Sequence, residues 1–410
     1  GFFMKKIILL FVFLVFYAPN ALFAKADKLS NIPPANLEFI NLEPQECNIA
    51  CLFELLKKGR VFSFISRFGQ NISNTQLLNA YYAILSGVEL NSAEAIFTPI
   101  NANAKIAVLI PKQSIKSYSF IVTNAILAYT ASSDKAVAIK FFITKDESTL
   151  DETILALQSE GFKYVIAPIT DAALPIISAQ KYEKIFFYIP TLHASLAKEY
   201  NDNIVFGGID YESQISALLE YANNKIASFG DGSRLSQLLN EQVKNFAPNA
   251  YIDVIDNKSV DLKSHLDNNK ALQNASIFLN TTLLRASLLA SQFRVYDLEP
   301  HAVLCTQICY DLVLFNLLRS ADRAKMLVAS SFGDIDDEIV AKAKILGIDL
   351  KFDRVAYPTI FGLDYIITQF LFNGTNARFN EIINNGQVAY RTHIYKVNSK
   401  GFVNITKQKR

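Results

Sequence analysis

The sequence lacks the short motifs that mark common catalytic sites. It contains no G-x-S-x-G nucleophile elbow, no Walker phosphate loop and no G-x-G-x-x-G dinucleotide fingerprint. Its four histidines stand far apart, without the H-x-x-x-H spacing of a zinc site: His193, His265, His301 and His393. These absences predict a protein that is not an enzyme and that holds no metal or other cofactor.

The sequence also lacks an excess of charge of either sign. It has 40 basic and 38 acidic residues, and Lys5 and Lys6 are the only charged residues among the first 24. If those 24 residues are removed, the chain is neutral. Nucleic acids and anionic membrane surfaces are bound mainly through clustered positive charge, so neither is expected as a partner.

Long apolar runs are absent except near the start. From Met4 the chain reads MKKIILLFVFLVFYAPNALFA, which has a basic start, an apolar run to Tyr17 and small residues at Ala21 and Ala24. This pattern predicts a cleavable signal peptide over 1–24 and a periplasmic protein. An uncleaved inner-membrane anchor is the alternative. The signal region has no cysteine, so lipid attachment there is not expected, and residues 25–45 read as an extended lead-in.

Cysteine is scarce but regularly placed. The four cysteines form two pairs with the same spacing, Cys47 with Cys51 and Cys305 with Cys309. Export makes disulfides the default. Residues four apart on a regular helix have Cβ atoms ~5–6 Å apart, too far for a disulfide, so local pairing requires a bent turn or a strand-to-helix corner. We favour local pairs because the spacing recurs, with cross-pairing of the two regions as the alternative.

The remaining sequence is apolar enough for two or three packed cores, at 51% hydrophobic residues. Residues 46–98 show helical spacing only. From Lys105 onward, short apolar runs alternate with amphipathic stretches, which predicts parallel sheets with helices on both faces. The runs are 106–110, 137–143, 164–169, 185–190, 225–229, 251–255, 276–280, 301–305 and 326–331. Nine runs fit two successive sheets.

We therefore predict two doubly wound α/β lobes joined by a hinge that the chain crosses several times. Lobe one spans 105–210 plus roughly 355–403, and lobe two spans 211–354. FDRVAYPTIFGLDYIITQFLFNG starts with a run that fits a strand and continues into a long helix. The tail QVAYRTHIYKVNSKGFVNIT predicts a hairpin around Asn398-Ser399-Lys400-Gly401.

This order of elements resembles the type I periplasmic-binding-protein fold, which includes the branched-chain amino-acid receptors. Local patterns carry the resemblance: the strand-loop-helix opening at 106–129, FGGIDYESQISALLEYA leading into lobe two, and GLDYIITQFL returning. Within that superfamily, PTLHAS followed by NIVFGGIDYESQISAL looks most like the penicillin-binding-protein activator lipoproteins. Those proteins carry helices before a two-lobed domain, as 46–98 predicts here, but the lipid-attachment cysteine is missing.

The resemblance implies a ligand cleft between the lobes, lined by the loops that follow the strands. In lobe one these loops carry Lys112, Gln113, Ser114, Ser117, Thr170, Asp171, Thr191 and His193. In lobe two they carry Asn280, Thr281, Thr306 and Gln307. Hydroxyl and carboxyl residues at these places are also the preferred helix N-caps, so capping is the plainer interpretation of any one of them.

Three residues bear on what the cleft holds. Amino-acid-binding relatives offer hydroxyls and free N–H groups to a carboxylate after the third strand, whereas Asp171 competes for that position here. A simple amino acid is therefore doubtful as the ligand. Lys112 offers a compensating charge or lies solvated on the rim. His193 is a cleft residue or, more simply, a structural histidine.

We expect a non-enzymatic binding protein that holds a small polar solute and signals by hinge closure to a membrane permease. The alternative is a protein-interaction regulator of peptidoglycan synthesis, with a cell-wall synthase as partner and a vestigial or regulatory cleft. A purely structural lobe pair is a third possibility. A hydrolase is a fourth, and it requires Ser114 or Ser233 to lie within hydrogen-bond reach of a histidine.

Overall fold

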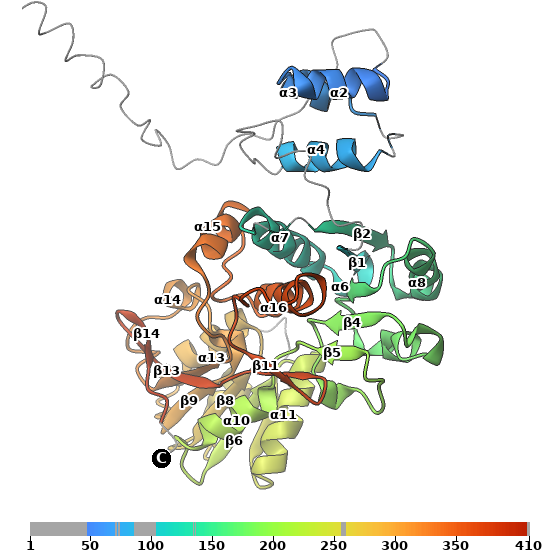
Figure 1. Ribbon diagram of the computed structural model, residues 1–410. Coiled ribbons are helices and arrows are strands. Elements are labelled where there is room, and N and C mark those ends of the chain that lie inside the picture. The colour runs from blue at the N-terminus through green and yellow to red at the C-terminus, as the bar shows by residue number, and fades with distance from the viewer. Residues whose placement is uncertain are drawn as a thin grey trace, which may run out of the picture. The chain divides into compact units, whose positions relative to one another are not determined.

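A computed structural model describes residues 47–69, 72, 74–85, 104–133, 135, 137–255 and 260–407. The chain divides into two compact units, 1–72 and 73–410 (Figure 1). The expected signal peptide at 1–24 and lead-in at 25–45 lie outside the described residues. Among the residues that are described, no helix is long and apolar enough to cross a membrane.

In the described part of the first unit the chain forms the helices α2 (Ile49–Lys57) and α3 (Val61–Arg67). Cys47 precedes α2 and forms a disulfide with Cys51 in its first turn. Asn48 caps the helix by accepting the N–H of Cys51 at 3.0 Å. Because Cys47 lies before the cap, it is not in helical register with Cys51, which is how a four-residue spacing becomes compatible with a disulfide.

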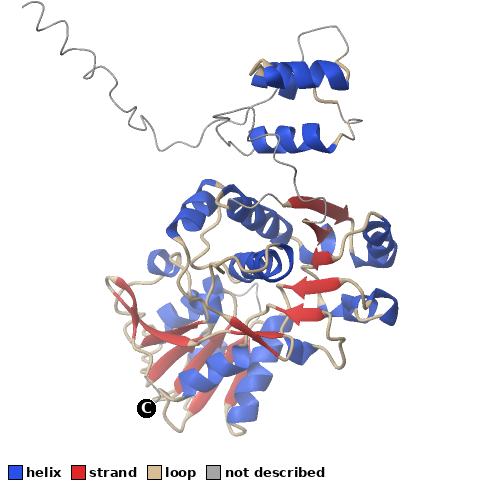
Figure 2. Cartoon of the chain, in the orientation of Figure 1, coloured by secondary structure: helices blue, strands red, loops and turns tan. Residues whose placement is uncertain are grey.

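The second unit begins with α4 (Thr75–Leu85) and contains two sheets (Figure 2). Sheet A, of lobe one, has the strand order β11-β12-β5-β4-β3-β1-β2. Its strands are β1 (Lys105–Pro111), β2 (Ala138–Thr144), β3 (Tyr164–Ile166), β4 (Phe186–Ile189), β5 (Ile204–Phe206), β11 (Ile382–Asn384) and β12 (Gln387–Ala389). The first five are parallel to one another, and β11 is antiparallel to β12.

Sheet B, of lobe two, has the order β14-β13-β10-β9-β8-β6-β7. Its strands are β6 (Ile226–Gly230), β7 (Tyr251–Val254), β8 (Ser276–Asn280), β9 (Ala302–Cys305), β10 (Met326–Ser330), β13 (His393–Asn398) and β14 (Gly401–Asn404). The first five are parallel, and β13 pairs antiparallel with both β10 and β14.

Helices cover both faces of each sheet. In lobe one they are α6 (Lys112–Ile115), α7 (Tyr118–Ala131), α8 (Leu150–Ser159), α9 (Leu174–Ile177), α15 (Asp337–Ile345) and α16 (Ala356–Ile366), which continues as the π-helix η6 (Ile367–Leu371). In lobe two they are α10 (Tyr211–Leu219), α11 (Arg234–Phe246), α12 (Lys263–Leu266), α13 (Leu283–Phe293) and α14 (Leu314–Leu317). Short 3-10 turns, among them η1 (Glu147–Thr149), η2 (Asp171–Ala173), η3 (Gln180–Tyr182), η4 (Ala194–Leu196) and η5 (Gln307–Cys309), complete several connections.

The pleat of the strands divides each lobe into two cores. In β1, Ile106 and Val108 pack with α7 and α16 on one face, whereas Ala107 and Leu109 pack with α8 on the other. Successive side chains of a strand point to opposite faces, so a strand covered on both faces is apolar throughout. This is why β1 reads as a continuous hydrophobic run, and it confirms the predicted fold class.

The chain passes between the lobes three times. It leaves lobe one after β5, at residues 207–210. The next helix, α10, already belongs to lobe two, since its Ile215 packs in the core of that lobe. It returns to lobe one after β10, at residues 331–336. The helix that follows, α15, packs its Ile339 in the core of lobe one. It crosses again at 390–392, between β12 in sheet A and β13 in sheet B.

The lobe boundaries differ from those expected from the sequence. Helix α15 lies in lobe one although 211–354 was assigned to lobe two, and the tail hairpin, assigned to lobe one, lies in sheet B. Residues 352–355, the expected start of a further strand, form turns that lead into α16. Apolar periodicity identifies an element but does not say which sheet it joins.

Candidate functional site

Two adjoining cavities lie between the lobes. The lobe-one cavity, of about 620 Å³, is lined by Ser114, Lys116, Ser117, Tyr118, Thr170, Asp171, Thr191 and Leu192 from lobe one and by residues of α11 from lobe two. The lobe-two cavity, of about 700 Å³, is lined by Asp231, Ser233, Asn280, Thr281, Thr282, Gln307, Tyr310 and Asp311, and by Asp349, Phe352 and Asp353 between α15 and α16. Arg234, Leu235 and Arg354 line both.

These side chains meet because parallel strands place their carboxyl ends at one edge of each sheet. Ser114 and Ser117 follow β1, Thr170 follows β3 and Thr191 follows β4. In lobe two, β6, β8 and β9 end at Gly230, Asn280 and Cys305, and the turns after them form the opposite wall. The cleft therefore lies where open α/β sheets place their ligands.

The hydrogen-bonding groups of Thr170 are already occupied by the protein. Its N–H donates to Glu147 Oε1 at 2.7 Å, and its hydroxyl donates to Glu147 Oε2 at 2.6 Å. Glu147 lies in η1, 23 residues earlier in the chain. An internal carboxylate thus takes the two donors that a ligand carboxylate would need at this position.

An ion pair joins the two walls of the cleft. Arg234 Nη2 of α11 lies 2.9 Å from Asp171 Oδ2 of lobe one. The Arg234 side chain is 81% exposed and that of Asp171 is 42% exposed. Pairs this exposed contribute less than about 1 kcal/mol, so the contact aligns the lobes without locking them together.

Arg354 enters the cleft from the connection between α15 and α16. Its Nη2 donates to the Tyr118 hydroxyl at 2.8 Å, and its guanidinium lies 6.0 Å from the centre of the Tyr118 ring. Arg354 therefore has a fixed position at the boundary of the two cavities.

Asp231 organises the wall of the lobe-two cavity. It is buried, and its carboxylate accepts the N–H groups of Ser233 at 3.1 Å and Thr282 at 2.9 Å. Burial opposes the charged carboxylate, but the hydrogen bonds from Ser233 and Thr282 outweigh it and lower the pKa of Asp231 below its ordinary value. A charged Asp231 holds the turns after β6 and β8 together.

Several buried polar atoms of lobe two have no hydrogen-bond partner within the described part of the chain, among them Asn280 Oδ1, Thr306 Oγ1 and Gln307 Nε2. Asn280 and Gln307 both line the lobe-two cavity. Leaving a buried donor or acceptor unpaired costs about 1–3 kcal/mol each. Asn280 Oδ1 and Gln307 Nε2 are therefore an acceptor and a donor at the cavity wall that a ligand could pair.

The structure brings eight of the twelve predicted ligand residues to the cavity walls: Ser114, Ser117, Thr170, Asp171, Thr191, Asn280, Thr281 and Gln307. Lys112, Gln113, His193 and Thr306 do not line either cavity. Lys112 and Gln113 are exposed, and the Gln113 N–H donates to Lys145 O at 2.7 Å.

The sequence interpretation missed Arg234, Arg354 and Glu147. Arg234 directly follows Ser233, which caps α11 by accepting the Ser236 N–H at 3.3 Å. Its place one residue after a strand-to-helix turn was a usable signal. Arg354 and Glu147 reach the site through long-range packing, which leaves no local pattern.

His193 has a structural role. Its Nδ1 accepts the Ser195 N–H at 3.2 Å and caps the turn η4. Burial lowers the pKa of His193 below its ordinary value, although Asp210 and Glu212 oppose the shift. His193 therefore fits the interpretation as a structural histidine better than the interpretation as a cleft residue.

We expect the free energy of unfolding to fall between pH 7.5 and pH 5.5. A histidine whose folded-state pKa is depressed takes up a proton more readily when unfolded, so stability is lost as pH drops below about 6.5. His193→Asn keeps a capping oxygen without titrating, so it should show a weaker pH dependence in urea unfolding at the two pH values. Burial and Arg391 also lower the pKa of His393, so we expect His393 to contribute to the pH dependence that remains in His193→Asn. An unchanged pH dependence in His193→Asn would contradict this assignment.

The described residues show neither a metal-binding group nor a hydrogen bond of Ser114 or Ser233 with a histidine. No group of three His, Cys, Asp or Glu side chains there is placed to hold a metal ion. Among the hydrogen bonds of the described residues, none joins Ser114 or Ser233 to a histidine; Ser233 instead caps α11.

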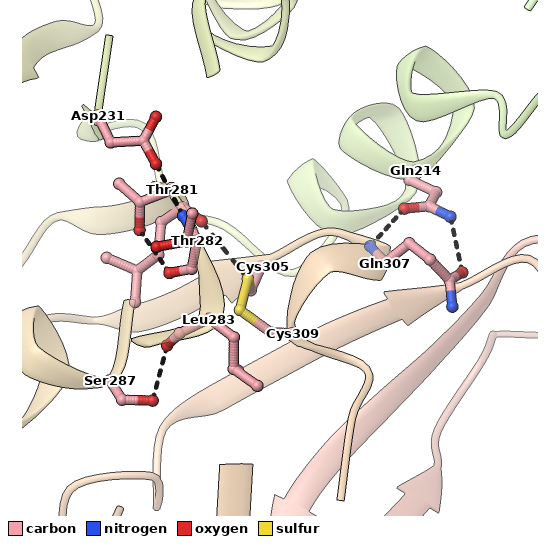
Figure 3. Close-up of a disulfide and its surroundings, with 10 residues drawn as sticks. Gln214, Asp231, Thr281, Thr282, Leu283, Ser287, Cys305, Gln307 and Cys309 are labelled. Atoms are coloured by element: carbon pink, nitrogen blue, oxygen red, sulfur yellow. Dashed lines mark hydrogen bonds between the residues drawn. A yellow bond between two sulfur atoms is a disulfide. The ribbon is translucent and has the colours of Figure 1, made fainter. Parts of the chain in front are cut away.

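The predicted local disulfides are both present. Besides Cys47–Cys51, the structure has Cys305–Cys309, with Cα atoms 5.8 Å apart. Cys305 ends β9 and Cys309 ends η5, so the bond closes the strand-to-turn corner that the sequence offered (Figure 3).

Comparisons with known proteins identify the fold. No protein-family model matches the sequence, and no curated protein matches it. A possible leucine/isoleucine/valine-binding protein from Rhodopirellula baltica is similar in structure, with a TM-score of 0.53 and 12% identity over 75% of this chain and 98% of its own. A leucine-, isoleucine-, valine-, threonine- and alanine-binding protein from Brucella ovis, in a closed conformation, has a TM-score of 0.55 and 11% identity over 73% of this chain and 94% of its own.

Full-length LpoA from Haemophilus influenzae is similar over more of the chain. Its TM-score is 0.53 at 12% identity, and the match covers 87% of this chain and 73% of that protein. A separate structure of the LpoA C-domain describes it as a regulator of PBP1A. At these identities the likeness shows the fold alone, and this chain has the two-lobed type I periplasmic-binding-protein fold.

Proposed function

We propose that this chain is an exported, non-enzymatic binding protein that holds a small polar solute between its lobes and responds by closing about its three crossings. The carrying observation is the pair of adjoining cavities, which share Arg234, Leu235 and Arg354 and are lined from both lobes. A ligand that contacts both walls binds the closed arrangement more tightly than an open one, and so shifts the protein toward closure.

The cavities have the size and chemistry of a small-molecule site. Volumes of about 620 and 700 Å³ fall within the ~300–1,000 Å³ typical of ligand pockets. Their walls combine apolar side chains such as Leu235 with hydroxyl, amide and guanidinium groups that orient a polar ligand. The two similar amino-acid-binding proteins support a solute in this cleft.

The geometry disfavours an amino acid held by its carboxylate at Thr170. Glu147 occupies both donors there, and Asp171 adds a second negative charge. A carboxylate ligand would have to displace Glu147 and leave it without these two hydrogen bonds. A short peptide or a sugar, bound through hydroxyl and amide groups, fits the remaining surface better.

A thermal-stability panel tests the proposal. The purified oxidised protein is heated with amino acids, short peptides, sugars and cell-wall fragments, since a ligand at about 100 times its Kd stabilises the native state by ~2.7 kcal/mol. Arg354→Gln removes a cation that lines both cavities and should weaken binding at least about tenfold, because hydrogen bonds to charged groups contribute ~1.5–3 kcal/mol. Lys112→Gln is the matched control, since Lys112 is exposed and lines neither cavity.

Two results would count against a solute receptor. One is a melting temperature that no compound changes in a well-folded protein. The other is a ligand response that Lys112→Gln removes as fully as Arg354→Gln, since the binding site would then lie outside the cleft.

One observation supports a second candidate, a regulator of a peptidoglycan synthase. The match to full-length LpoA covers 87% of this chain, whereas the matches to the two amino-acid-binding proteins cover 73% and 75%. Residues 104–407 make up about three quarters of the chain, so the LpoA match extends beyond the two lobes. The helices in 46–98 would then supply a partner surface. This candidate would be supported if no compound changed the melting temperature and if the purified chain stimulated a purified penicillin-binding synthase.

A further inference from the structure

Gln307 lies at the junction of the lobe-two cavity and the hinge. It is the first residue of η5, directly after Thr306, and the Cys305–Cys309 disulfide closes the turn that contains it (Figure 3). Its side chain is buried and lines the lobe-two cavity.

A buried hydrogen-bond network connects this turn to two segments of lobe two. The Gln307 N–H donates to Gln214 Oε1 at 2.8 Å, and Gln214 Nε2 donates to Ser331 Oγ at 2.7 Å and to Gln307 Oε1 at 3.3 Å. The Ser331 N–H donates to Gln307 Oε1 at 2.7 Å. All three residues are at least 98% buried.

The partners of Gln307 stand where the chain passes between the lobes. Gln214 lies in the first turn of α10, just after the crossing at 207–210, and Ser331 begins the crossing at 331–336. One turn of lobe two therefore fixes the ends of two of the three crossings. A displacement of η5 has to displace or break both connections, because buried hydrogen-bonded groups lose much of their stabilisation when unpaired.

The same side chain also has a buried donor at the wall of the lobe-two cavity. Gln307 Nε2 has no partner among the described residues, whereas Gln307 Oε1 accepts both Gln214 Nε2 and the Ser331 N–H. A ligand acceptor bound to Nε2 would therefore displace the Gln307 side-chain amide, whose Oε1 is bonded to both crossings.

We propose that Gln307, braced by the Cys305–Cys309 disulfide, is the positioning residue that couples the lobe-two cavity to the hinge. The ligand side of this coupling rests on the proposed function; the mechanical side, between η5 and the crossings, does not. The disulfide keeps η5 a fixed turn, so a change at Gln307 reaches Gln214 and Ser331 instead of being absorbed locally.

Hydrogen exchange of the full-length protein without any ligand tests the mechanical side. Gln307→Met fills the same volume but cannot accept the bonds from Gln214 and Ser331. It should raise amide exchange in 207–214 and 331–336 at least about tenfold, the factor that corresponds to the loss of one to two buried hydrogen bonds. Cys305→Ser combined with Cys309→Ser should raise exchange in the same two segments.

Two variants serve as controls. Gln307→Glu keeps the Oε1 acceptor, so exchange in the two crossings should stay closer to the wild type than in Gln307→Met, although the variant buries a carboxyl group. Cys47→Ser with Cys51→Ser removes a disulfide of the same spacing from the other unit and should leave both crossings unchanged.

Two outcomes would overturn the proposal. If Gln307→Met leaves the crossings unchanged, Gln307 does not hold the hinge. If exchange in β8 rises as much as in the crossings, Gln307 merely stabilises lobe two. If no compound in the thermal-stability panel raises the melting temperature, the proposed function is weakened, but the hydrogen-exchange result for Gln307 is not affected.

Discussion

Gly362→Ala is expected to lower the free energy of unfolding by about 3 kcal/mol, near the upper end of the usual cost of overpacking. A Cβ at Gly362 would lie 2.1 Å from two ring atoms of Tyr188. That ring has no room to move, because Tyr188 is fully buried and its hydroxyl donates to Pro358 O at 2.8 Å. Chemical denaturation of the two proteins measures the difference.

The sign of the effect is itself diagnostic. Gly362 lies inside α16, where helix propensity alone predicts that alanine stabilises by about 1 kcal/mol. Gly69→Ala, which meets no atom within 4 Å, is the control and should change stability by less than about 0.5 kcal/mol. In the Gly362→Ala background, Tyr188→Leu should cost much less than it does alone, because the smaller side chain relieves the clash. A stabilising Gly362→Ala would show that the contact between α16 and β4 is looser than described.

Asp364→Ala is expected to cost about 2–4 kcal/mol, because it leaves one buried and one partly buried donor without their acceptor. Asp364 Oδ1 accepts the Tyr129 hydroxyl at 2.6 Å, and Oδ2 accepts the Arg378 N–H at 3.0 Å. The Arg378 guanidinium also donates to the Ser132 hydroxyl at 2.8 Å and lies 5.3 Å from the centre of the Tyr129 ring. The carboxylate thus joins α16 to the end of α7 and to the segment before β11.

Asp364→Asn separates geometry from charge. It keeps an oxygen for Tyr129, so it should cost less than alanine at pH 7. Burial raises the pKa of Asp364, with the bonds from Tyr129 and Arg378 opposing. A carboxyl with a raised folded-state pKa binds its proton more tightly when folded, so the wild type gains stability relative to Asp364→Asn as pH falls from 7 toward about 4. Urea unfolding at both pH values checks this, and a difference that shrinks toward pH 4 would contradict the sign.

The architecture was predictable where local pattern and sheet burial agree. The run 276–280 matches β8 residue for residue, and the tail hairpin turns at the predicted residues. Both depend on side chains a few positions apart. The assignment of elements to lobes depends on which sheet edge is free, so α15 and the strands β13 and β14 fell on the wrong side of the predicted division.

The candidate site was predictable only in outline. Strand ends identify the edge where ligands bind, and this placed Thr170 and Gln307 on the cavity walls. The partners of these residues decide their chemistry. Glu147 reaches Thr170 across 23 positions and Gln214 reaches Gln307 across 93 positions, separations at which a single sequence has no periodic signal.

The strands β12, β13 and β14 come last in the described chain, and this affects the order in which the two sheets can form. Sheet A gains β12 beside β5 through Gln387 and Phe206, and sheet B gains β13 beside β10. Both sheets therefore keep an unpaired edge until residues 387–404 have been synthesised. Open edges of apolar strands pair readily with other chains, and contacts this distant in sequence form slowly. The two lobes should thus reach their native state only once residues 387–404 have been synthesised, and the nascent chain has to be kept from aggregating until then.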